Sequence, residues 1–133
     1  MAGLVGDTHA VLWYIFGDPR LSELAAGAID AAAMDGDPIY VPSICLVEAT
    51  YLVEKGRVPL AALDRLTSAL RNPQAGFRAA PLDLDVAFYV RKVPRDFVPD
   101  MPDRIIAATA LAMDLPLVSR DGRIRSANIH TIS

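Results

Sequence analysis

Short apolar runs alternate along the chain with longer segments that have the composition and spacing of helices. Residues 4–6 form one such run and end at Asp7, which is typical of a buried strand followed by a turn. Asp7 and Thr8 then indicate a helix start, and residues 9–16 have the length of the helix body. This alternation continues to the end of the chain and predicts an α/β domain with a mostly parallel sheet covered on both faces.

The same signals predict the remaining elements. The expected strands span residues 4–6, 39–41, 77–82, 116–119 and 128–132. The expected helices span residues 9–16, 22–34 with Ser22 as N-cap, 43–55, 59–70, a helix that begins within 86–90 and stops at Pro94, and 103–113. Residues 35–38 are expected to form a turn and 94–102 a loop, because proline and glycine or aspartate gather there. Since ligands of parallel sheets bind beyond the carboxyl ends of the strands, the residues just after each strand are the first candidates for a site.

Composition limits the class of protein. The chain has 133 residues, the length of one domain, and 53% of them are hydrophobic, which excludes a disordered chain. The mean hydropathy of +0.29 is high for a domain in which no apolar run approaches the roughly 20 residues of a membrane-spanning helix. We therefore expect no membrane association, but an apolar surface for a partner or a second copy. The N-terminal segment lacks a basic region and is unlike a signal peptide, so a cytoplasmic location is expected.

Charge and cysteine content narrow the class further. A net charge of −3 predicts no broad surface for nucleic-acid phosphates. Several basic residues nevertheless gather late in the chain, either as ordinary surface charges or as a local patch: Arg91, Lys92, Arg95, Arg104, Arg120, Arg123 and Arg125. The single cysteine, Cys45, excludes an internal disulfide and a cysteine-based zinc site. Its apolar neighbours predict an inert, buried thiol.

Three aspartates occupy positions that suit a site at the edge of the sheet. Asp7 and Asp121 directly follow expected strands, although each could instead be a helix cap or a turn residue. Asp103 is aligned with the apolar stripe of its expected helix, one turn before it. That stripe consists of Ile106, Ala107, Ala110 and Leu111. The alternative for Asp103 is an acid that complements the helix dipole in the first turn, with Asp100 as the N-cap.

Glu48 is harder to explain as a structural residue. It falls within the apolar stripe expected for its helix, which consists of Ile44, Val47, Tyr51 and Leu52. A carboxylate on the core face of a helix is costly unless it is paired or bound to a cation. The alternative to a cation site is therefore a buried salt bridge between Glu48 and an arginine.

These four acids come from four separate segments and are all expected at one edge of the sheet. Close carboxylates repel one another unless a cation neutralises them. His9 and His130 are too few and too scattered for a histidine-rich site, so the ligands on offer are oxygens, which suit Mg²⁺ or Mn²⁺. Enzymes that hydrolyse phosphodiesters commonly use carboxylates that hold such a cation.

Four stretches resemble the motifs of PIN-domain nucleases, and in particular those of the VapC toxins of bacterial and archaeal toxin–antitoxin pairs. They are residues 6–13 (GDTHAVLW), 42–48 (PSICLVE), 102–110 (PDRIIAATA) and 115–121 (LPLVSRD). The order and spacing of these motifs match the family over nearly the whole chain. Residues 1–133 are therefore identified as a single PIN domain, which implies a three-layer α/β/α fold with a central, mostly parallel sheet.

The resemblance also implies an activity. Members of the VapC family are Mg²⁺-dependent endoribonucleases that cut tRNA or rRNA, with Mn²⁺ as a substitute. They form homodimers and are held inactive by a VapB-type antitoxin. The implied catalytic and metal-binding set is Asp7, Glu48, Asp103 and Asp121. Thr8 and Ser119 match positions where the family often places a supporting hydroxyl. We expect the arginines that flank the third and fourth motifs to guide RNA phosphates: Arg104, Arg120 and Arg123.

Three other classes remain as alternatives. One is a catalytically inactive PIN fold that serves as a binding module. Another is a phosphorylatable receiver domain, which requires paired acids after the first strand and a lysine after a late strand. Here Asp7 has no acidic neighbour, and neither Lys55 nor Lys92 follows a late strand. A phosphatase that opens with two aspartates one residue apart is disfavoured because position 9 is His9.

Overall fold

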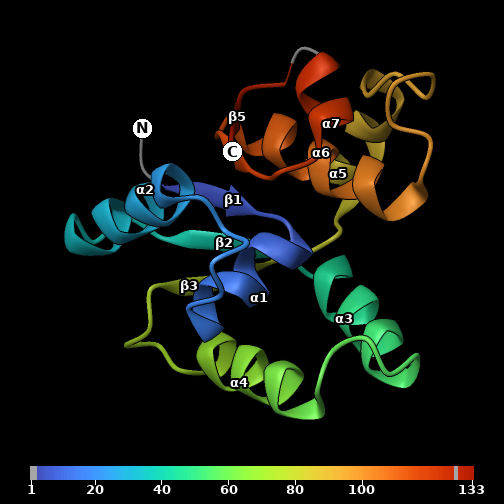
Figure 1. Ribbon diagram of the computed structural model, residues 1–133. Helices are drawn as coiled ribbons and strands as arrows, with labels where there is room; N and C mark the ends of the chain where they lie inside the picture. Colours follow the sequence, from blue (N-terminus) through green and yellow to red (C-terminus); the bar gives the residue numbers. More distant parts are fainter. Residues whose placement is uncertain (1–2, 128) are drawn as a thin grey trace.

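A parallel sheet forms the centre of the protein in the computed structural model, which describes residues 3–127 and 129–133 (Figure 1). Among these residues the sheet has five strands in the order β3-β2-β1-β4-β5, and every neighbouring pair is parallel. The strands are β1 (Leu4–Gly6), β2 (Ile39–Pro42), β3 (Phe77–Ala80), β4 (Leu117–Val118) and β5 (Thr131–Ile132). Because β1 lies between β2 and β4, the segments that follow β1 and β4 leave the sheet next to each other.

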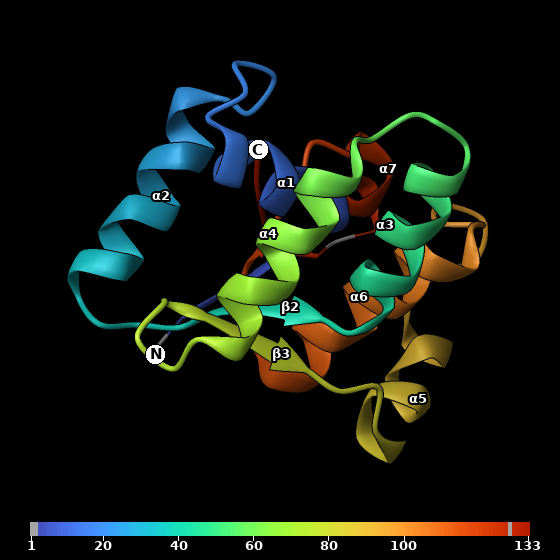
Figure 2. The same cartoon turned by 90° about the horizontal axis from the view of Figure 1, so that it is seen from below.

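Helices cover both faces of the sheet and make the fold a three-layer α/β/α arrangement (Figures 1 and 2). They are α1 (Thr8–Phe16), α2 (Glu23–Met34), α3 (Ile44–Glu54), α4 (Leu60–Arg71), α5 (Leu84–Tyr89), the 3-10 turn η1 (Val90–Lys92), α6 (Met101–Met113) and α7 (Gly122–Ser126). The first, second and fourth helices lie on one face, whereas α5 and α6 lie on the other. Helix α3 follows β2 and contacts α1, α4 and α6.

The alternation of side chains along β1 and β4 places their two faces in two different core clusters. Val5 and Leu117 are fully buried in the larger cluster, together with Ile106 of α6. Leu4 and Val118, which point to the opposite face, are buried in the smaller cluster that α2 completes. Burial of each such side chain contributes about 1.5–3 kcal/mol to folding. The short strands are therefore held mainly by their two apolar faces.

Most of the predicted elements are present, and the differences have local causes. Helix α6 begins at Met101 rather than 103, because Pro102 occupies its first turn, where proline is tolerated. Helix α5 begins at Leu84 rather than 86, because the Asp83 carboxylate accepts a hydrogen bond from the backbone N–H of Val86. The predicted last strand is shorter, and position 128 lies outside the described residues. In the described part of the chain, no helix has both the length and the apolar character that crossing a membrane requires.

The face that α3 buries differs from the prediction. Its buried side chains are the small residues Cys45 and Ala49, whereas Val47 and Tyr51 are 51% and 60% exposed. Apolar residues surround almost the whole of this helix, so its pattern does not select one face, and contact with the neighbouring elements decides. Glu48 is consequently not a core residue but a partly exposed one on the side of α3 that meets α1.

Candidate active site

The adjacency of β1 and β4 brings Asp7 and Asp121 to the same edge of the sheet. Each caps the helix that follows it: the Asp7 carboxylate accepts from the N–H of Ala10 at 2.9 Å, and the Asp121 carboxylate accepts from the N–H of Arg123 at 2.9 Å. Ser119 links the two residues, because its hydroxyl accepts from the N–H of Asp121 at 3.0 Å and hydrogen-bonds to the Asp7 carboxylate. The capping alternative is therefore correct for both aspartates, and it does not remove them from the site.

Glu48 and Asp103 reach the same place from the helices that follow β2 and the 94–100 loop. The Thr8 hydroxyl donates to the Glu48 carboxylate and so joins the start of α1 to α3. Asp103 lies in the first turn of α6, and its side chain is 25% exposed. Among the described residues, Glu48 forms no ion pair with a lysine or arginine, so the predicted alternative of a buried salt bridge is wrong. All four acids line one cavity of about 240 Å³. The other lining residues are Thr8, His9, Trp13, Ile106, Arg120 and Arg123.

The cavity raises the pKa of two of its carboxylates. Burial is the main cause of the raised pKa of Asp7, and the hydrogen bonds from Ser119 and Ala10 oppose it. Burial also contributes most to the raised pKa of Asp103, about 6, and the negative charges of Glu48 and Asp121 add to it. Ionised carboxylates in this arrangement are short of positive charge, which is the electrostatic condition for binding a cation.

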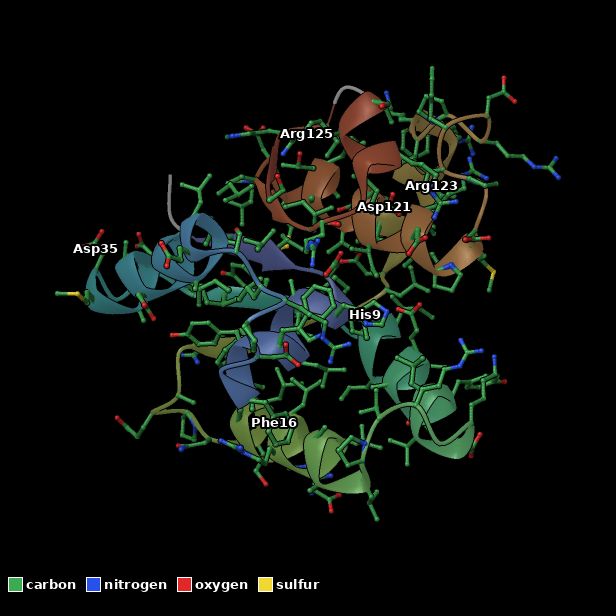
Figure 3. All side chains as sticks on the ribbon, viewed as in Figure 1. His9, Phe16, Asp35, Asp121, Arg123 and Arg125 are labelled. Atoms are coloured by element: carbon green, nitrogen blue, oxygen red, sulfur yellow. The ribbon has the colours of Figure 1, made fainter. Side chains whose placement is uncertain are left out.

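Arg123 supplies part of the missing positive charge. Its Nη2 lies 3.2 Å from Asp121 Oδ2, 3.5 Å from Asp103 Oδ2 and 3.7 Å from Asp100 Oδ2. Figure 3 shows Arg123 and Asp121 at the start of α7, with His9 on α1 across from them. The Arg123 side chain is 52% exposed, so each of these ion pairs is weak. Arg123 can therefore leave the carboxylates at little cost.

The residues of the cavity fit a hard divalent cation by their chemistry, since all four acids offer oxygen ligands. Within the described residues, however, no three acidic, histidine or cysteine side chains already converge as a ready-made metal site. Asp103 and Asp121 are turned toward Arg123 instead. Binding of a cation would thus require Asp103 and Asp121 to release the Arg123 guanidinium and to coordinate the ion instead.

The predicted arginines do not all reach the cavity. Arg120 and Arg123 line it, whereas Arg104 does not. The Arg104 guanidinium donates from Nη2 to the carbonyl oxygens of Val90 and Val93, at 2.9 Å each, and ties η1 to α6. Arg104 is therefore a structural residue, and its position does not match the prediction of an RNA contact. Arg125 hydrogen-bonds to Thr131 and Ser133 near β5.

Two aromatic side chains of the site, His9 and Trp13, were not predicted. Both lie on α1, one turn apart, with ring centroids separated by 5.5 Å and planes inclined by 30°. In the sequence, His9 and Trp13 are four residues apart and follow the candidate acid Asp7. On a helix this spacing places the two rings side by side, and it is the signal that could have identified them. They add a stacking surface to one wall of the acidic cavity.

Comparisons with known proteins identify the family and support the fold. The family model for the PIN domain matches residues 4–129. The chain is 32% identical over 126 residues to Ribonuclease VapC22 of Mycobacterium tuberculosis (strain ATCC 25618 / H37Rv), covering 95% of this chain and 92% of that protein. Its fold is similar to a chain in the crystal structure of VapBC2 from Rickettsia felis bound to a DNA fragment from their promoter, with a TM-score of 0.71 and 17% identity over 97% of this chain and 96% of that one. A chain of DNA-bound VapBC from Salmonella typhimurium gives a TM-score of 0.70 and 17% identity over 98% and 97% of the two chains. The carboxylate-lined cavity thus lies in a chain that belongs to the PIN-domain family, among its VapC-type members.

Proposed function

We propose that this protein is the toxin of a type II toxin–antitoxin pair and that it acts as a Mg²⁺- or Mn²⁺-dependent endoribonuclease. The observation that carries the proposal is the meeting of four carboxylates, from four separate segments, in one cavity at the carboxyl edge of the sheet. The 32% identical relative is named a ribonuclease, which supports the same activity here. The substrate we propose is a tRNA or rRNA in the cytoplasm.

The side chains of the cavity divide into three roles in this proposal. Asp7, Glu48, Asp103 and Asp121 would hold the divalent cation. When bound, the cation supplies charge neutralisation for the phosphate and a more acidic water. Thr8 and Ser119 hold the Glu48 and Asp7 carboxylates through hydrogen bonds. Arg120 and Arg123 are exposed at the rim, where their guanidinium groups suit the oxygens of an RNA phosphate.

One of the four carboxylates of the cavity would also orient the attacking water or accept its proton. Hydrolysis by water does not use the ribose 2′-hydroxyl as nucleophile, so the products should carry a 5′-phosphate and a 3′-hydroxyl. A 2′-hydroxyl mechanism would leave a 2′,3′-cyclic phosphate instead.

End-group analysis of cleaved RNA, with and without EDTA, tests the proposal. We expect 5′-phosphate and 3′-hydroxyl ends, with no cleavage in EDTA and recovery on addition of Mn²⁺. Asp7→Asn and Asp103→Asn should lower the cleavage rate at least about 100-fold. Asp85→Asn is the matched control, because Asp85 is an exposed acid of α5 outside the cavity. Cyclic phosphate ends, or cleavage that persists in EDTA, would refute the mechanism. An intact site that cleaves no RNA would favour the inactive binding module.

The partner we propose is a VapB-type antitoxin, and the assembly contains a homodimer of this chain. The two similar solved structures described above are of VapBC2 and VapBC, each bound to DNA, which supports a VapB-type partner here. Large apolar side chains are exposed on α3 and α5, among them Tyr51 at 60%, Leu84 at 84% and Phe88 at 47%. We propose that these side chains contribute to the surface for the antitoxin or for the second copy. Light scattering at micromolar concentration tests the dimer, and a monodisperse monomer would count against it.

A further inference from the structure

A second cavity adjoins the acidic one and has a different chemistry. It has a volume of about 520 Å³ and shares two lining residues, His9 and Trp13, with the acidic cavity. Its walls combine apolar side chains, such as Leu12 and Phe16, with the guanidinium groups of two arginines, Arg20 and Arg57. A ligand that crosses the His9–Trp13 pair therefore passes from a cavity rich in carboxylates to one that is apolar and basic.

Trp13 forms the boundary between the two cavities, and cations gather around it. The guanidinium carbon of Arg20 lies 5.2 Å from the indole centroid, and that of Arg120 lies 5.6 Å from it. Arg120 also donates to the backbone carbonyl of Arg20 at 2.8 Å. Both arginines are exposed, so their guanidinium groups can move from the indole to a ligand. The indole itself is partly exposed.

We propose that Trp13 and the second cavity form a nucleobase subsite for the RNA strand that is cut in the acidic cavity. This inference rests on the proposed ribonuclease function. The flat aromatic surface of Trp13 and His9 suits stacking with a base, and base–aromatic stacking is how single-stranded nucleic acid is held without base-specific contacts. In this arrangement Arg20 and Arg120 contact the phosphates on either side of the stacked nucleotide.

Charge complementarity favours RNA as the occupant. The acidic cavity alone repels a phosphodiester backbone, and the whole chain carries a net charge of −3. Asp18 pairs with Arg20 at 2.7 Å, so Arg57 and Arg120 supply the net positive charge next to the aromatic pair. A strand held on this side can keep its scissile phosphate near the carboxylates although they oppose it.

The chain offers a direct probe, because Trp13 is its only tryptophan. Tryptophan emission, excited at the long-wavelength edge where the four tyrosines absorb little, therefore reports on this subsite. The titration uses a six-nucleotide oligoadenylate in EDTA at low salt, so that binding is measured without cleavage. An abasic oligomer of the same length and charge is the control ligand. We expect the oligoadenylate to quench Trp13 and the abasic oligomer to leave its emission unchanged.

A pair of variants separates stacking from folding. Trp13→Leu keeps an apolar side chain but removes the aromatic face, and Trp13→Phe restores that face. By anisotropy of labelled oligoadenylate, Trp13→Leu should bind roughly 5- to 100-fold more weakly, and Trp13→Phe within about threefold of the wild type. The melting temperature of each variant verifies folding. If Trp13→Leu does not fold, quenching by RNA but not by the abasic oligomer in the wild-type protein decides the question.

The outcomes for the subsite and for the ribonuclease proposal are distinct. Cleavage of RNA by wild type and Trp13→Leu at equal KM, with no quenching, would overturn the subsite and leave the ribonuclease function standing. Quenching by RNA without cleavage under any metal condition would support the subsite and refute the activity. Quenching by an arginine-containing antitoxin peptide, but not by RNA, would assign the second cavity to the protein partner and overturn the inference.

Discussion

Asp103→Asn should stabilise the metal-free protein, because an ionised Asp103 is unfavourable in the folded state. Burial and the charges of Glu48 and Asp121 raise its pKa from 3.8 to about 6. The folded protein therefore binds the Asp103 proton more tightly than the unfolded chain does. The contribution of Asp103 to the free energy of unfolding is fully present below pH 3.8 and is lost as the pH rises through about 6. Asp7, whose pKa is also raised, acts in the same direction.

The size of the effect follows from the two pKa values. They differ by about 2 pH units, which corresponds to an upper limit of about 3 kcal/mol above pH 7. The Asp103 side chain is 25% exposed, and its removal also breaks the ion pair with Arg123 at 3.5 Å. Solvent screening and this lost pair reduce the expected gain to about 1 kcal/mol. For a domain of this size that is a rise in melting temperature of roughly 3–5 °C.

Thermal unfolding in EDTA at pH 8 and pH 4 measures this difference. We expect Asp103→Asn to melt higher than wild type at pH 8, and the difference to shrink at pH 4, where Asp103 is protonated in the folded protein and only partly ionised in the unfolded chain. Asp100→Asn is the control, because Asp100 lies in the same network but its side chain is 63% exposed. Its effect should stay within about 0.5 kcal/mol. Saturating Mn²⁺ should reverse the order at pH 8, because only the wild type gains the full binding energy of the cation.

A lower melting temperature for Asp103→Asn at pH 8 in EDTA would refute the reasoning. It would mean that the ion pair between Asp103 and Arg123 outweighs burial and repulsion, so that the acids of the cavity form a structural network. An equal gain at pH 8 and pH 4 would also contradict it, because the gain would then not come from the charge of Asp103.

Three further predictions concern the scaffold. Gly6→Ala should destabilise the protein by about 1–3 kcal/mol in urea unfolding, because the new Cβ would lie 2.5 Å from Cγ2 of Val11. Gly27→Ala lies in an open position of α2 and should instead stabilise the protein by up to about 1 kcal/mol. Burial raises the pKa of the Cys45 thiol, so a thiol reagent should label it only when the protein unfolds; labelling of the native protein would contradict this. Arg104→Gln should cost about 1–3 kcal/mol of stability without changing RNA affinity, which gel-shift and melting measurements separate.

The strands and the acids could be predicted from the sequence because the order of elements constrains both. In a parallel sheet every strand ends at the same edge, so an acid just after a strand, such as Asp7 or Asp121, is placed there by topology alone. Asp103 was predictable because it lies one turn before Ile106 and Ala107, which are buried, although the burial of α6 extends over all of residues 105–110 and not over one stripe. In these cases local pattern and global fold agree.

Other features depend on contacts that no local pattern contains. Packing against α1, α4 and α6 determines which face of α3 is buried. The small residues Cys45 and Ala49 on that face allow α3 to approach these helices closely. The role of Arg104 depends on the carbonyl groups of Val90 and Val93, which the chain brings to it from more than ten residues away. Helix α7 has only five residues, Gly122–Ser126, and the capping carboxylate of Asp121 helps to start it. Such a short helix has no periodicity to detect.

The caps explain how a fold can hold acids together that repel one another. Asp7 and Asp121 each accept a hydrogen bond from a helix N-terminus, which contributes about 1 kcal/mol per cap. These bonds offset part of the cost of placing the carboxylates side by side, and they fix the carboxylates at the edge of the sheet before any ligand arrives. Asparagine caps a helix as well as aspartate does, so Asn substitutions remove the charge and keep the cap, whereas Ala substitutions remove both. A loss of activity in Asn variants therefore reports on the charge of the site rather than on its scaffold.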